Sequence, residues 1–190
     1  EFLSVPVNVV SPPDGNVIAI LCNSLRACPE VLPRRDLSDL SFMGADPRRE
    51  GLQLDMNCAR NAFERGEWKS STVLNGSVME ALLLWAIEQH PYRWKEAAQS
   101  CKVLKWTRDE KEPPHWDIGD YLKVAGSLGL ITEETRAQCD LAKKFRNLIH
   151  PGREVRLEAR CDRATALSTE TAVAVIIRDL EKNLPDAPLR

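Results

Sequence analysis

The sequence feature that most constrains the fold is an apolar segment covering residues 68 to 89. Its apolar residues recur at three- and four-residue steps, which predicts an amphipathic helix. The segment lies between two stop signals, Gly66 and the His90-Pro91 pair. Because the apolar stripe is wide, we expect other elements to cover this helix on several sides. The stripe consists of Val73, Leu74, Val78, Leu82, Leu83, Ala86 and Ile87.

Small residues in the middle of this segment indicate close packing. Glycine inside an exposed helix costs about 1 kcal/mol relative to alanine, so Gly76 and Ser77 most simply mean the close approach of another helix. Glu80 follows one turn later. We expect a solvated charge there, because burying an unpaired acid is costly. The alternative is a carboxylate that faces a basic surface.

Five further segments have the start and stop signals of helices, and none has the pattern of a convincing sheet. A helix is also favoured over a strand for residues 16 to 28. The sequence therefore predicts an all-α, up-and-down bundle of five to seven helices over residues 46 to 190. Residues 1 to 45 are expected to form an extended arm plus a short helix. The five segments are residues 46 to 66, 92 to 105, 117 to 129, 132 to 152 and 162 to 184.

Composition excludes several classes of protein. The 190 residues fit one domain, and the net charge of −2 favours no charged partner by itself. The six cysteines are scattered without metal-ligand spacing, so no metal site or cofactor is expected. No run approaches the roughly 20 apolar residues of a membrane span. We therefore expect no membrane partner, free thiols and a reducing cytoplasm.

Basic residues cluster in one region. Residues 136 to 163 contain eight Lys or Arg against four acids, a local excess of +4. Three of the five tryptophans, at positions 94, 106 and 116, lie in a second basic stretch. They could stack on bases, but the burial preference of tryptophan favours a role in fixing a loop to the bundle.

The segment from residue 132 to residue 152 combines a helix with a polar stripe. Thr132 is a suitable N-cap, and Pro151 with Gly152 is a stop. One face is expected to be buried, with Ala137, Leu141, Phe145 and Leu148. A second face carries Arg136, Asp140, Lys143, Asn147 and His150.

Arg146 and His150 are one helical turn apart, which suggests a chemical role. An arginine can hold a phosphate through its planar fork, and a histidine titrates near neutrality. These two functions suffice for metal-free RNA cleavage, in which a base activates the ribose 2′-hydroxyl and an acid protonates the leaving oxygen. Asn147 would support them, and Lys143, Lys144 and Arg153 would attract the nucleic-acid backbone. The plainer interpretation is a terminal histidine that caps carbonyl groups.

The residues FRNLIHPG, from 145 to 152, resemble the arginine-asparagine to histidine motif of the HEPN superfamily (higher eukaryotes and prokaryotes nucleotide-binding domain). Residues 67 to 85 are similar to the early HEPN helix that carries small residues and a glutamate. The resemblance implies a helical bundle that often dimerises into a composite site. Many members are metal-independent ribonucleases of toxin or antiviral systems, in which the residues matching Arg146 and His150 are essential. Others are inactive and serve binding or assembly.

The resemblance leaves three interpretations of the site. The first is a dimeric HEPN-like ribonuclease with RNA as substrate and an antitoxin or other protein as a further partner. The second is an inactive HEPN-like module that binds RNA, a nucleotide or a protein. It is suggested by the three residues between Arg146 and His150, where the family normally has four to six. The third is a polar network inside the bundle, with Glu80 as a partner, that fixes helix register.

Overall fold

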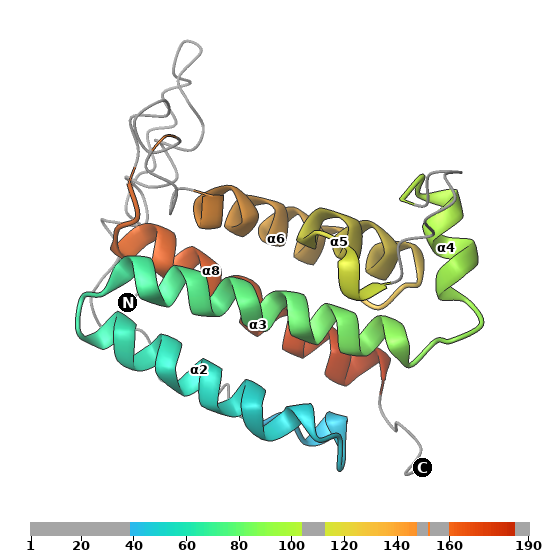
Figure 1. Cartoon of the computed structure of the whole chain (residues 1–190), viewed down its shortest axis with the longest axis horizontal. Coiled ribbons are helices and arrows are strands. Elements are labelled where there is room, and N and C mark those ends of the chain that lie inside the picture. Colours follow the sequence, from blue (N-terminus) through green and yellow to red (C-terminus); the bar gives the residue numbers. More distant parts are fainter. Residues whose placement is uncertain (1–38, 104–112, 148–151, 153–159, 185–190) are drawn as a thin grey trace, which may run out of the picture.

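The computed structural model describes residues 39–103, 113–147, 152 and 160–184 of the chain. Within these residues the protein has six α-helices and no strand, so the predicted all-α bundle is confirmed (Figure 1). The helices are α2 (Arg48–Glu64), α3 (Trp68–Glu88), α4 (Trp94–Ser100), α5 (Ile118–Ser127), α6 (Glu133–Arg146) and α8 (Arg163–Asn183). Two 3₁₀ turns, η1 (Ser41–Met43) and η2 (Pro113–His115), accompany them.

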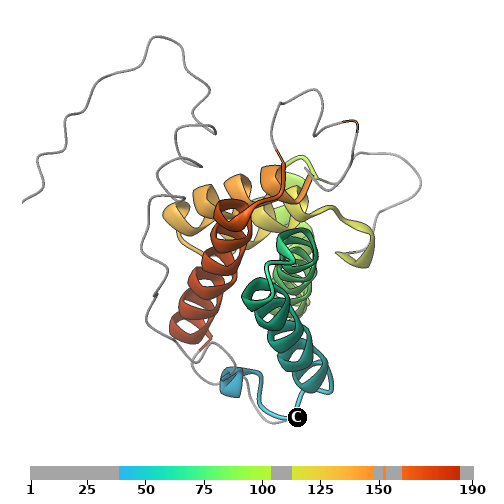
Figure 2. The ribbon, with the colours of Figure 1, turned by 90° about the vertical axis from the view of Figure 1, so that its left-hand side faces the viewer.

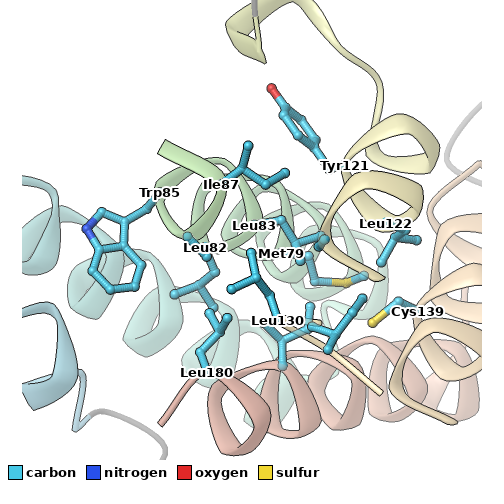
Figure 3. Packing of buried hydrophobic residues seen from close by; sticks show 14 of the residues in the cluster. Met79, Leu82, Leu83, Trp85, Ile87, Tyr121, Leu122, Leu130, Cys139 and Leu180 are labelled. Carbon is cyan, nitrogen blue, oxygen red and sulfur yellow. The ribbon is translucent and has the colours of Figure 1, made fainter. Parts of the chain in front are cut away.

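Helix α3 is the centre of the bundle, as its wide apolar stripe predicted. It packs against α2, α5, α6 and α8, and Figures 1 and 2 show these helices gathered around it. Its C-terminal half supplies Leu82, Leu83 and Ile87 to the core. Figure 3 shows these side chains in one cluster with Leu122 of α5, Cys139 of α6 and Leu180 of α8. A helix that is apolar on most sides is buried on most sides.

By length and composition alone, α3 could also cross a membrane, and within the described part of the chain this is true of no other helix. Most of its apolar window is buried inside the bundle. The core helix of a globular protein has the same properties, so the finding gives little support to a membrane span.

The helix starts follow from local side-chain chemistry. Asp117 caps α5 by accepting two backbone N–H groups of its first turn, at 2.6 and 3.1 Å. Thr132 caps α6 by accepting the N–H of Thr135 at 3.2 Å. Asp162 and Thr165 form a reciprocal capping box at the start of α8. All three starts were predicted from the sequence.

Two predicted elements differ from the structure. Helix α4 begins at Trp94 and ends at Ser100, so the expected helix over residues 92 to 105 was too long. Its Trp94 packs edge-on against the buried Trp116, with ring centroids 5.8 Å apart. These two tryptophans pack as the burial preference predicted, and Trp106 lies outside the described residues.

The buried face of α6 is also not the predicted one. The buried residues are Thr135, Cys139, Ala142 and Phe145, whereas Ala137 is exposed and Leu141 is half-buried. Of the expected apolar face, Phe145 alone among the described residues is fully buried, and Leu148 lies outside them. The prediction counted the most apolar residues and overlooked Thr135 and Cys139, which are small enough to pack closely and whose polar groups cost little when partnered.

Helix α6 is fixed to α8 at its start by a buried carboxylate. Asp179 of α8 is 3% exposed, and it accepts the backbone N–H of Thr132 at 2.9 Å. The neighbouring Arg178 donates to the same carboxylate at 2.7 and 3.0 Å. One acidic side chain thus ties the first turn of α6 to the bundle.

The first turns of α3 and α8 bury several small polar residues. Both helices begin at the same end of the bundle, the left side of Figure 1. The fully buried large apolar side chains of α3 begin at Val78. The small buried polar residues are Ser71, Thr72 and Asn75 of α3 and Thr165, Ser168 and Thr169 of α8.

Candidate functional site

Arg146 is the last residue of α6, and its position along the helix turns it toward α3. It follows Cys139 by seven residues and Ala142 by four, so it continues the buried face of α6. Its side chain lies against the central helix and is 30% exposed.

Across the interface, Arg146 forms an ion pair with Glu80. The Nη1 group of Arg146 donates a hydrogen bond to Oε1 of Glu80, whose side chain is also 30% exposed. Glu80 is therefore only partly solvated and has one cationic partner, which is nearer to the alternative, a carboxylate that faces a basic surface, than to the expected solvated charge. The pairing gives the acid a cationic partner, which removes the objection that an unpaired carboxylate would be costly there.

Gly76 provides the space in which the arginine lies. A Cβ atom built on Gly76 would stand 2.7 Å from Cδ and 3.2 Å from Cγ of Arg146. The shorter of these distances is one that carbon atoms do not tolerate without a shift, and the longer one is tight. The small residues of α3 predicted the close approach of another helix, and the group that lies against Gly76 is the side chain of an arginine from α6.

Lys143, one turn before Arg146, has a similar environment on α5. Its Nζ lies 3.6 Å from Oδ1 of Asp117, the N-cap of that helix. A Cβ atom on Gly119 would overlap this ammonium group. Burial alone would raise the pKa of Asp117, but hydrogen bonds from the first turn of α5 and the charge of Lys143 lower it overall.

The other predicted site residues are described only in part. Lys144 is exposed on α6, and Asn147 is the half-buried C-cap of that helix. His150 and Arg153 lie outside the described residues, so the structure does not place them relative to Arg146. Sequence reasoning expected close packing at Gly76 but not against an arginine, and it assigned no role to Gly119. A usable signal was the four-residue step from Gly76 to Glu80, which puts both on one face of α3.

The site combines two cations with two carboxylates, so its local charge is balanced. A guanidinium has five N–H donors, and the bond to Glu80 uses one of them. The arrangement therefore orients an arginine without exhausting its capacity to bind an oxyanion. In the described part of the chain, no group of three or more His, Cys, Asp or Glu side chains could hold a metal ion.

Comparisons of the chain with protein-family models, with characterised proteins and with solved structures give no significant match.

Proposed function

We propose that this chain is a HEPN-like, metal-independent ribonuclease of a toxin or antiviral type, which acts as a dimer with a composite Arg/His site. The observation that carries the proposal is the Arg146–Glu80 pair. It holds a partly exposed guanidinium at the end of α6, four residues before His150. An arginine held in this way can bind a phosphate with little loss of side-chain entropy.

The proposed reaction is an internal phosphoryl transfer. Arg146 binds the scissile phosphate and stabilises the negative charge that develops on its oxygens. One imidazole takes the proton of the 2′-hydroxyl, and the resulting oxygen attacks the phosphorus. The 5′-oxygen leaves and receives a proton from a second imidazole. A second copy of the chain supplies that second His150, and the products are a cyclic phosphate and a 5′-hydroxyl end.

The test is cleavage of a fluorescent single-stranded RNA by the purified full chain between pH 5 and 9, with and without EDTA. Cleavage is expected to persist with EDTA and to disappear in His150→Ala and Arg146→Ala. Arg136→Ala is the matched control, because Arg136 lies on the same helix and is paired with Glu133 and Asp140 within it. Absence of cleavage at every pH would overturn the proposal.

A second candidate, an inactive RNA-binding module, is favoured by one specific observation. Both Lys143 and Arg146 are paired with carboxylates, which reduces the positive charge available to stabilise a reacting phosphate. This function predicts salt-sensitive RNA binding without turnover, weakened by Lys144→Ala or Arg153→Ala. Affinity for RNA that is unchanged in both variants would contradict it.

A further inference from the structure

We infer that Gly76 is a positioning residue of the candidate site, because its missing side chain forms the slot that sets the direction of Arg146. This inference rests on the proposed function, in which Arg146 binds the scissile phosphate. The contact concerns the stem of the arginine, since Cγ, Cδ and Nε all lie within 3.2 Å of where a Cβ would stand. Atoms so near the backbone cannot move aside unless the side chain changes rotamer.

Glu80 and Gly76 act on different parts of the same side chain. The carboxylate of Glu80 holds the Nη1 end, and the surface of Gly76 supports the stem one turn earlier on α3. Two contacts at separate points fix the direction of the Arg146 side chain, whereas the ion pair alone would leave that side chain free to rotate. Gly76 is buried in α3, where it has no turn or positive φ to explain it.

Lys143 and Gly119 repeat the arrangement on α5, with one informative difference. There the nearest group is Nζ of Lys143, the far end of a flexible side chain, and the next is Oδ1 of Asp117 at 2.9 Å. A methyl group on Gly119 therefore displaces the ends of two side chains but not the stem of the cation. We expect Gly119→Ala to be mild and Gly76→Ala to be severe for any function that needs the cation in place.

The experiment compares Gly76→Ala, Gly119→Ala and Gly126→Ala in the full chain. Gly126 is the matched control, because a Cβ there meets only Cδ of Arg136 at an ordinary 3.7 Å. Displacement of a catalytic group by about 1 Å can cost about 100-fold in rate, so Gly76→Ala should lower kcat by about that factor and change KM much less. The better helix propensity of alanine offsets much of the cost of the overlap with Arg146, so the Tm of Gly76→Ala should stay within a few degrees of wild type. If Gly76 had only a structural role, kcat and Tm of the variant would fall together.

A second readout keeps the inference testable without turnover. The Nε–H NMR signal of Arg146 is followed while an uncleavable 2′-O-methyl RNA is added. In the wild type the signal should shift on binding, and in Gly76→Ala this response should be lost. The response should be kept in Gly126→Ala.

The outcomes separate the inference from the proposed function. If the wild type cleaves RNA and Gly76→Ala cleaves equally well, the positioning role of Gly76 is refuted and the ribonuclease function is kept. If the wild type does not cleave RNA, the ribonuclease function is refuted, and the NMR signal of Arg146 then tests the role of Gly76. If Gly76→Ala still shows the shift on adding RNA, the positioning role is refuted. If the shift is lost, Gly76 positions Arg146 for RNA binding alone.

Discussion

Replacement of Asp179 by alanine should lower the free energy of unfolding by about 2 to 3 kcal/mol at pH 7. Its carboxylate is 3% exposed and accepts the backbone N–H of Thr132 at 2.9 Å. A hydrogen bond to a charged group contributes about 1.5 to 3 kcal/mol. The ion pair with Arg178 adds little, since that side chain is 58% exposed and such pairs contribute about 0 to 1 kcal/mol. Asp179→Asn keeps one acceptor oxygen and should lose about half as much.

The measurement is urea unfolding followed by circular dichroism, repeated across pH. Burial would raise the pKa of Asp179, but its hydrogen bonds and Arg178 lower it below the ordinary 3.8. The stabilisation is therefore fully present above about pH 4 and is lost as the pH falls through the lower folded-state pKa. Glu181→Ala, on the exposed side of α8, is the control and should stay within about 0.5 kcal/mol. An Asp179→Ala variant as stable as this control, or a difference unchanged at pH 3, would refute the reasoning.

Three further predictions follow from the described residues. Burial raises the pKa of the half-buried Glu170, so its charged form destabilises the folded protein. Glu170→Gln should therefore raise Tm at pH 7 but not at pH 4. An equal rise in Tm at both pH values would contradict this. Burial also raises the pKa of Cys139 to about 12, so iodoacetamide should modify the exposed Cys58 in the native protein and reach Cys139 only after unfolding, as judged by mass spectrometry. A double-mutant cycle of Glu80→Ala and Arg146→Ala should give a coupling energy of about 1 kcal/mol, because both side chains are partly exposed. A coupling near zero would mean that the pair does not hold in solution.

The sequence was informative where helix chemistry is local. Asp117, Thr132 and Asp162 each act within one turn of their own helix, so their capping roles could be predicted without knowledge of the fold. The centrality of α3 followed from its apolar width. The all-helical class followed from these signals together.

The site was harder to predict, because its contacts join helices far apart in the sequence. Glu80 and Arg146 are separated by 66 residues, and nothing local to either one reveals the other. The direction of Arg146 depended on the buried face of α6, which was assigned from Ala137 and Leu141. Thr135 and Cys139 are buried because they contact α8 and the core, which are distant in sequence. Apolar periodicity alone could not predict this burial.

The small buried polar residues at the start of α3 have a consequence for motion. Ser71, Thr72 and Asn75 bury less apolar area than the leucines of the opposite end, so less hydrophobic free energy resists separation of the helices there. Amide hydrogens at the start of α3 should consequently exchange with solvent deuterium sooner than those between Val78 and Ile87. Arg146 contacts α3 where these two regions join: Gly76 belongs to the less stable segment and Glu80 to the more stable one.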